Sequence, residues 1–87
     1  MNNLSFSPVA WDEYLYRQTQ DKKTLRKINE LLRDICRNAF QGIGKPEPLK
    51  QKNDFWSRRI DQKNRLVYCV TKDHDIMILS CKGHYEE

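Results

Sequence analysis

The chain has 87 residues, of which 38% are hydrophobic and 32% are charged, and its formal net charge is +4. This length allows one compact domain with a single small core, and it excludes a two-domain enzyme with a separate cofactor module. Its apolar runs are too short to span a bilayer and its first residues do not resemble a signal peptide, so we expect a cytoplasmic protein that does not act at a membrane.

The positive charge is concentrated in the middle of the chain. Between Arg17 and Arg65 there are 14 Lys and Arg residues against 6 Asp and Glu residues, whereas the two ends together hold 2 against 6. Such a distribution is typical of a protein that binds a polyanion, and nucleic acid is the first candidate. A basic helix surface that contacts only solvent would give the same pattern.

The first half of the chain predicts a short strand followed by two helices. Residues 4–7 alternate apolar and small polar side chains, and Ser7 followed by Pro8 is a typical start for a helix that reaches about Gln20. Asp21 can cap a second helix, in which apolar residues recur at helical spacing. These apolar residues are Leu25, Ile28, Leu31, Leu32, Ile35 and Cys36. The basic residues between them are Lys22, Lys23, Arg26, Lys27, Arg33 and Arg37.

The second half predicts a loop and three strands. Residues 38–48 contain most of the glycines and prolines of the chain, which indicates an irregular loop. Residues 55–60, 65–71 and 76–81 are rich in aromatic and β-branched side chains, and the short segments between them are hairpin-like. The expected fold is therefore a single α+β domain over residues 1–87. Two N-terminal helices pack on one face of a mainly antiparallel sheet of four to five strands.

The three cysteines indicate neither a disulfide framework nor a metal site. Cys36, Cys69 and Cys81 form no C-x-x-C pair, and no histidines lie near them at metal-ligand spacing. Each has apolar neighbours, so we interpret all three as small buried hydrophobic residues rather than reactive thiols. We expect no metal and no other cofactor.

Two residues are candidates for acid–base chemistry. His84 follows the last predicted strand, which would bring it to the rim of the sheet, where a histidine can donate or accept a proton near neutral pH. Glu47 lies between Pro46 and Pro48, which restrict the backbone and hold the carboxylate in place. An inert terminal histidine and a stiff loop with an incidental glutamate remain the alternatives. His74, in a predicted turn, is interpreted as a surface residue.

Arginines in the predicted strands could bind phosphate or only solvate an open sheet face. Arg58 and Arg59 are neighbours in one strand and point to opposite faces, so at most one shares a face with Arg65 unless a bulge intervenes. Nearby aromatic side chains either stack on bases or belong to the core. These are Phe55, Trp56 and Tyr85.

The ordered motifs of the chain resemble the YoeB-type toxins of the RelE superfamily over nearly the full length. The loop reads G-I-G-K-P-E-P-L-K over residues 42–50, the first strand after it reads F-W-S-R-R-I over residues 55–60, and the next begins R-L-V-Y. His84 and Tyr85 complete the pattern near the end. Residues 11–16 and 27–31 of the two helices also match. This combination in so short a chain is highly specific.

The resemblance implies a RelE-like, microbial-RNase-like fold and a toxin of a type II toxin–antitoxin pair. Such a toxin is an endoribonuclease, or mRNA interferase, that enters the ribosomal A site, cuts the mRNA there and stops translation. The implied partners are a cognate antitoxin of the YefM or Axe type, the ribosome with its mRNA, and a second copy of the chain in a homodimer. The alternatives are a non-enzymatic, gyrase-binding toxin of the same superfamily and a plain RNA-binding module.

The resemblance also implies the roles of individual residues. Cleavage of RNA without a metal needs a base for the 2′-OH, an acid for the leaving 5′-oxygen and a cation for the phosphate. The corresponding catalytic residues are Glu47 as general base, His84 as general acid, Arg65 as the phosphate-stabilising cation, and Tyr85 as the terminal tyrosine. The residues expected to bind RNA are Lys45, Lys50 and Arg59.

Overall fold

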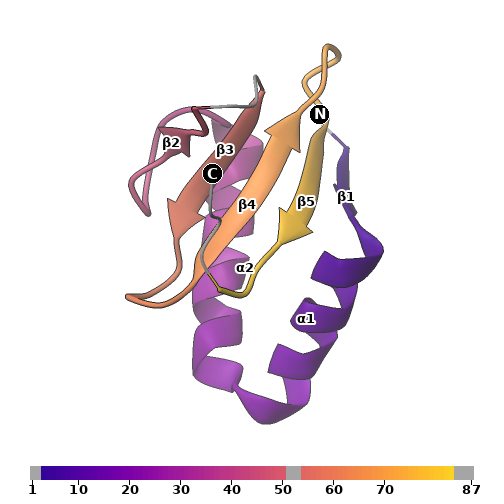
Figure 1. Cartoon of the computed structure of the whole chain (residues 1–87), viewed down its shortest axis with the longest axis vertical. Helices are drawn as coiled ribbons and strands as arrows, with labels where there is room; N and C mark the ends of the chain where they lie inside the picture. Colours follow the sequence, from indigo (N-terminus) through magenta and orange to yellow (C-terminus); the bar gives the residue numbers. More distant parts are fainter. Residues whose placement is uncertain (1–2, 51–53, 84–87) are drawn as a thin grey trace.

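The structure, a computed structural model, describes residues 3–50 and 54–83. In chain order its elements are β1 (Leu4–Phe6), α1 (Pro8–Gln20), α2 (Lys22–Arg37), β2 (Glu47–Pro48), β3 (Phe55–Arg59), β4 (Arg65–Val70) and β5 (Ile76–Ser80). The strands form one sheet in the order β1-β5-β4-β3-β2 (Figure 1). β1 runs parallel to β5, whereas the pairs β5–β4, β4–β3 and β3–β2 are antiparallel.

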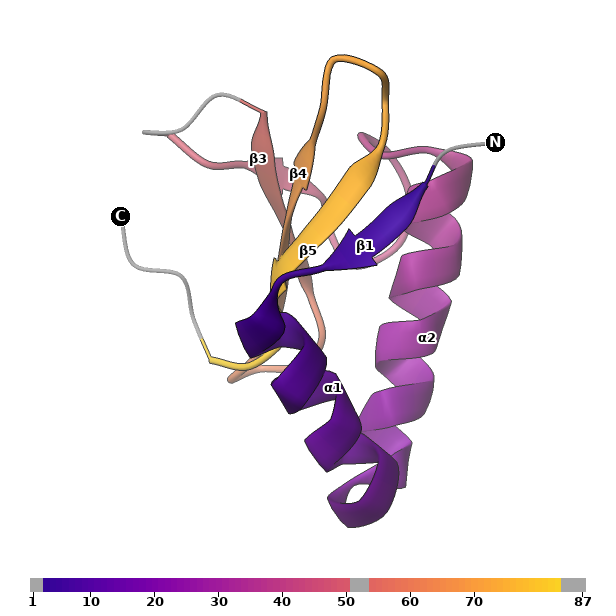
Figure 2. The same cartoon turned by 90° about the vertical axis from the view of Figure 1, so that its right-hand side faces the viewer.

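Both helices lie on the same side of this sheet. Figure 2 shows α2 alongside one face and α1 below β1 and β5, so neither helix covers the opposite face. The predicted α+β fold, with two helices on one face of a mainly antiparallel sheet, is confirmed. Neither helix in the described ranges is both long and apolar enough to cross a membrane.

The two helices begin where the sequence predicts. Ser7 Oγ accepts a hydrogen bond from the Ala10 amide at 3.1 Å and donates one to the Leu79 carbonyl at 3.0 Å, so this cap also ties α1 to β5. Asp21 ends α1 and caps α2, and its carboxylate accepts from the Thr24 amide at 3.1 Å and the Thr24 hydroxyl at 2.7 Å. Both starts follow from local sequence chemistry.

The core lies between α2 and the helix-facing side of the sheet. Ile28, Leu31 and Ile35 of α2 are fully buried, as are Leu66 and Tyr68 of β4. Burial of this stripe fixes the position of α2 behind β3 and β4. It also fixes which side chains of the sheet point inward, since side chains alternate along each strand.

The interpretation of the cysteines holds for only one of the three. Cys81 is buried, and burial raises the pKa of its thiol to about 11. Cys69 is partly buried, and Cys36 is exposed. The expectation for Cys36 is wrong because the buried stripe in the last turns of α2 runs through Leu31, Asp34 and Ile35, so Cys36 lies outside it.

The sheet extends one strand further than the loop composition indicates. Within the predicted irregular loop, Glu47 pairs with Ser57 and Pro48 with Trp56, which adds β2 to the edge of the sheet. A proline can lie in an edge strand because its missing N–H costs no ladder hydrogen bond there. A bulge between β4 and β5 leaves Leu79 between the pairs Tyr68–Ile78 and Val67–Ser80. Ile78 and Ser80 therefore pair with adjacent residues of β4 and lie on opposite faces of the sheet, although they are two residues apart.

Candidate active site

Arg65 begins β4 and lies on the same face of the sheet as Arg59. The two residues are direct partners in the antiparallel pair of β3 and β4, and direct partners share a face. Arg58 instead pairs with Leu66, which belongs to the core beneath α2. The register thus answers the question that strand alternation left open: Arg59, not Arg58, accompanies Arg65 on the face away from the helices.

Ser57 holds the Arg65 side chain against this face. Arg65 Nε donates to Ser57 Oγ at 3.0 Å, and Arg65 Nη2 donates to the Lys45 carbonyl at 3.4 Å. Only 16% of the Arg65 side chain is exposed. These contacts hold the guanidinium in place, so it loses less side-chain entropy when it binds an anion. Ser57 is not among the residues predicted from the sequence, although strand alternation with Arg59 places it on the same face.

Glu47 faces Arg65 from the edge strand β2. Its Oε2 lies 3.8 Å from Arg65 Nη2, and 63% of the Glu47 side chain is exposed. The pairing of Glu47 with Ser57 in β2–β3 brings the carboxylate to the arginine. Because Glu47 is largely exposed and the distance is long, this ion pair contributes little to stability, and the carboxylate can exchange this partner for another one at low cost. The arrangement joins a carboxylate and a guanidinium on the sheet face that neither helix covers.

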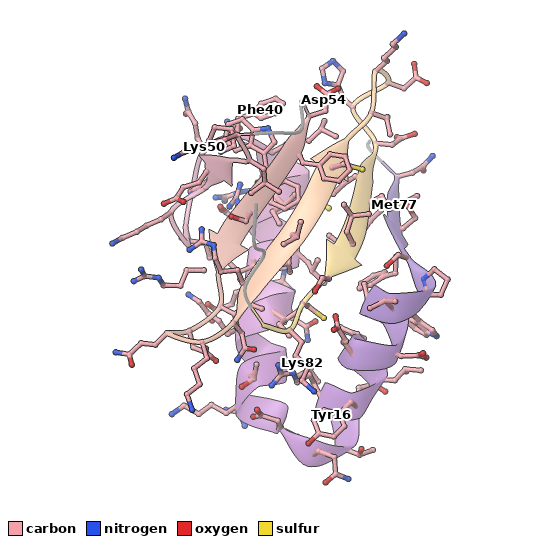
Figure 3. The ribbon with its side chains drawn as sticks, in the orientation of Figure 1. Tyr16, Phe40, Lys50, Asp54, Met77 and Lys82 are labelled. Atoms are coloured by element: carbon pink, nitrogen blue, oxygen red, sulfur yellow. The ribbon has the colours of Figure 1, made fainter. Side chains whose placement is uncertain are left out.

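The three predicted RNA-binding residues lie around this pair. Lys45 and Lys50 flank β2, Arg59 ends β3, and all three are exposed. Lys45 has a positive φ of 51°. Figure 3 shows Lys50 at the edge of the molecule that carries β2. Glu47 thus has a lysine on either side of it in the sequence and Arg65 facing it in space, which suits a polyanion that crosses the sheet edge.

The C-terminal end of the described chain is attached next to Arg65. The Gly83 amide donates to Asn64 Oδ1 at 2.7 Å, and Asn64 Nδ2 donates to both carboxylate oxygens of Asp61 at 3.1 Å. Asn64, like Ser57, is a site residue that the sequence motifs do not indicate. The predicted general acid His84 and the predicted catalytic Tyr85 lie outside the described residues.

Arg58 has a different role from the one that its sequence suggests. It is fully buried and forms an ion pair with Asp34 of α2, with 2.5 Å between Nη1 and Oδ2. The hydrogen bond from Arg58 holds the pKa of the Asp34 carboxyl below its usual value. Both interpretations of Arg58, as a phosphate ligand and as a surface cation, are wrong because its side chain points to the helix side. The signal for Asp34 is its position between Leu31 and Ile35 on the buried stripe.

The remaining candidates have structural or surface positions. Trp56 packs against the core and lies 5.1 Å from the Phe40 ring, centroid to centroid, which confirms the core interpretation for this residue. Phe55 is partly buried opposite Cys69. His74 is exposed in the turn between β4 and β5, as expected. Within residues 3–50 and 54–83, no three His, Cys, Asp or Glu side chains gather as a metal site would require.

Comparisons with known proteins identify one family of similar proteins over nearly the whole chain. Residues 6–85 match the family model described as YoeB-like toxin of bacterial type II toxin–antitoxin system. Toxin YoeB of Escherichia coli strain K12 is 52% identical over 83 residues, which are 94% of this chain and 98% of that protein. The YoeB dimer from Staphylococcus aureus has a TM-score of 0.88 at 53% identity and covers 97% of this chain and 98% of its own. The YoeB–YefM complex from Staphylococcus aureus has a TM-score of 0.85 at 52% identity and covers 98% of this chain and 99% of its own.

Proposed function

Because this chain belongs to the YoeB-like toxins of bacterial type II toxin–antitoxin systems, we propose that it is an endoribonuclease that cuts mRNA in the ribosomal A site. Cleavage inside the open reading frame stops translation, which is how the toxin acts. The pairing of Glu47 with Arg65 on the sheet face away from both helices carries the proposal. A small molecule would bind in a concave pocket, whereas this pair lies at the edge of the sheet, where an extended polymer can pass.

The proposed reaction is a metal-independent transesterification. Glu47 takes the proton from a ribose 2′-OH, and the 2′-oxygen then attacks the adjacent phosphorus. The bond from phosphorus to the 5′-oxygen breaks, and His84 gives that leaving oxygen a proton. The products are a 2′,3′-cyclic phosphate and a free 5′-OH, so each proton that one residue gains is balanced by one that another residue loses.

Arg65 stabilises the charge that develops on the phosphate. Its Nη2 atom lies 3.8 Å from the Glu47 carboxylate, so a phosphate oxygen on Arg65 would bring the adjacent 2′-OH close to Glu47. The Ser57 hydroxyl at Arg65 Nε keeps the cation in this place. Tyr85 is assigned to the catalytic set by resemblance to the family. Lys45, Lys50 and Arg59 bind the RNA backbone on either side of the cut.

We infer that the chain also has protein partners. The Staphylococcus aureus relatives form a YoeB dimer and a YoeB–YefM complex. By similarity, this chain binds an antitoxin of the YefM or Axe type and can form a homodimer. Its proposed substrate, mRNA on the ribosome, places its action in the cytoplasm.

The test is cleavage of a defined mRNA on purified ribosomes by the purified toxin. Loss of a general base commonly costs about 100-fold or more in rate, so Glu47→Gln should reduce cleavage by that factor. Glu30→Gln is the matched control, since it removes the same charge from an exposed glutamate of α2. His84→Gln should also reduce cleavage. Translation arrest without any cut mRNA would favour the binding-only alternatives.

A further inference from the structure

Arg58 is the centre of a buried hydrogen-bond network that extends beyond its ion pair with Asp34. A guanidinium carries several fixed N–H donors, and those of Arg58 find acceptors at Nε, Nη1 and Nη2. Nε donates to the Tyr68 hydroxyl at 3.2 Å. The other acceptors are the carbonyls of Ile43 at 3.2 Å, Asn38 at 2.6 Å and Gln41 at 3.1 Å. Each of these three carbonyls belongs to the loop before β2.

Asp34 and Tyr68 bind the same loop. Asp34 Oδ2 accepts from the Ile43 amide at 3.0 Å, and the Tyr68 hydroxyl donates to the Ala39 carbonyl at 2.7 Å. The loop backbone at Gly42 approaches Asp34 closely, because a Cβ atom at Gly42 would lie only 1.8 Å from Asp34 Oδ2. The buried groups therefore hold the backbone of residues 38–43 from the helix side of the sheet.

The same loop leads directly to the candidate catalytic carboxylate. Gly44 has a φ of 79°, which a glycine adopts freely, whereas Lys45 has a φ of 51°, a conformation that a residue with a side chain keeps only where the surroundings enforce it. The Gly44 carbonyl accepts from the Arg59 amide at 2.6 Å, and the Lys45 carbonyl contacts Arg65. Glu47 follows in the same segment.

β2 supports Glu47 through a short edge pairing only. It has two residues at the edge of the sheet, and one of them, Pro48, has no N–H for the ladder. The Leu49 amide donates to the Phe55 carbonyl at 2.9 Å, which secures the segment only after Glu47. The position of the Glu47 carboxylate therefore depends on the loop before it as well as on the pairing of Glu47 with Ser57.

We propose that Arg58, neutralised by Asp34, is a positioning residue that acts through the loop of residues 38–45 to set Glu47 against Arg65. Arg58 is fully buried, so it contacts the loop and not the substrate. The inference rests on the proposed ribonuclease function and deepens it. Displacement of a catalytic group by about 1 Å can lower the rate about 100-fold, so a residue that fixes the position of Glu47 can have a large effect on cleavage.

The test compares Arg58→Lys with Arg17→Lys. Lysine keeps the charge but presents its donors from one nitrogen, so it cannot replace the planar fork of Arg58. Arg17 is also a buried arginine, paired with Asp21 at 3.0 Å on α1, away from the loop. Single-turnover cleavage is measured at saturating toxin, at a temperature where circular dichroism shows every variant folded. Arg58→Lys should cleave between about tenfold and about 100-fold more slowly with unchanged half-saturation, and Arg17→Lys should cleave as the unmodified toxin does.

A double-mutant cycle with Glu47→Gln separates positioning from general loss of structure. If Arg58 acts through Glu47, Arg58→Lys slows the Glu47→Gln protein by less than about twofold. Equal slowing with and without Glu47 would overturn the inference. Tyr68→Phe, which removes only the hydroxyl between Arg58 and Ala39, replaces Arg58→Lys if the latter does not fold, and the same cycle then decides.

The results of these experiments distinguish a failure of the inference about Arg58 from a failure of the proposed ribonuclease function. No cleavage by the unmodified toxin would overturn both. Cleavage that Glu47→Gln does not reduce would overturn the role of Glu47 and therefore also the inference. Cleavage that depends on Glu47 but not on Arg58 or Tyr68 would overturn the inference alone.

Discussion

The Arg65 amide donates a hydrogen bond to the Gly83 carbonyl at 3.0 Å. This bond joins the start of β4 to the last residue of the described chain, and His84 follows Gly83 directly in the sequence. The residue that is proposed to bind the phosphate is thus attached, through its own backbone, to the segment that leads to the proposed acid. Asn64 strengthens the attachment from the neighbouring position, since it accepts from the Gly83 amide at 2.7 Å.

We predict that Asn64→Ala reduces cleavage without reducing ribosome binding. The variant loses the bond to Gly83, and a loss of about 1.4 kcal/mol in transition-state stabilisation would lower the rate about tenfold. The control is Asn29→Ala, because Asn29 accepts from the Tyr14 hydroxyl at the same distance of 2.7 Å but lies on α2. Equal single-turnover rates for Asn64→Ala and the unmodified toxin would show that this attachment has no role in the reaction.

We predict that Asp34 makes the stability of the fold depend on pH. Arg58 lowers the pKa of Asp34 in the folded state, so ionised Asp34 stabilises the protein above about pH 4. This stabilisation is lost as the pH falls through the lowered, folded-state pKa. Asp34→Asn should cost about 3 kcal/mol at pH 7, because it leaves the buried Arg58 charge without a counterion.

Urea unfolding at several pH values measures this effect. The difference in unfolding free energy between the unmodified protein and Asp34→Asn should shrink as the pH falls below about 4. Asp21 and Asp61 also have lowered pKa values, but they are present in both proteins and cancel in the difference. A difference that is constant from pH 7 to about pH 2 would contradict the assigned role of Asp34.

Local contacts of this fold are predictable from the sequence, whereas long-range contacts are not. The starts of α1 and α2 are predictable because Ser7 and Asp21 act on backbone amides a few residues away. The pair of Asp34 and Arg58 spans 24 residues of sequence, and nothing local indicates that a charged strand residue is buried. The role of Arg58 follows from the register, because a shift by one residue would exchange Arg58 and Arg59.

The candidate site also combines residues that the sequence indicates with residues that only the fold reveals. Motif resemblance indicates Glu47 and Arg65, and the structure brings them within 3.8 Å of each other. Ser57 and Asn64 have no motif of their own, and their roles depend on which strands are neighbours. Residue types that bind through a single hydrogen bond are common at the surface, so only the folded arrangement distinguishes them.

We predict that the basic face of α2 governs the affinity for ribosomes and not the rate of cleavage. Lys22, Lys23 and Arg26 are exposed at its N-terminal end. Their triple replacement by Gln should remove about three phosphate contacts and reduce the slope of log affinity against log salt by about two to three. Cleavage at saturating toxin should not change. If the slope stays constant while the triple variant loses cleavage at saturation, the assignment to binding is wrong.

We predict that the antitoxin inhibits by covering the Glu47–Arg65 surface. A disordered acidic segment that folds on the cationic residues around β2 would use the charge complementarity that attracts RNA. Hydrogen exchange of the toxin with and without its antitoxin should show protection of residues 43–49. The turn at residues 71–75, between β4 and β5, is the internal control. Full inhibition with no protection of residues 43–49 would indicate a mechanism remote from the site.

The most direct test of the account is single-turnover cleavage of ribosome-bound mRNA whose nucleotide 5′ of the cut carries 2′-deoxyribose. The account assigns Glu47 to the 2′-OH, so the all-ribose mRNA should be cut to a 2′,3′-cyclic phosphate or 3′-phosphate end and the 2′-deoxy mRNA should remain intact. Binding of the two mRNA complexes to the toxin should be equal. Cleavage of the 2′-deoxy mRNA at a similar rate would show that water is the nucleophile and would contradict the role assigned to Glu47.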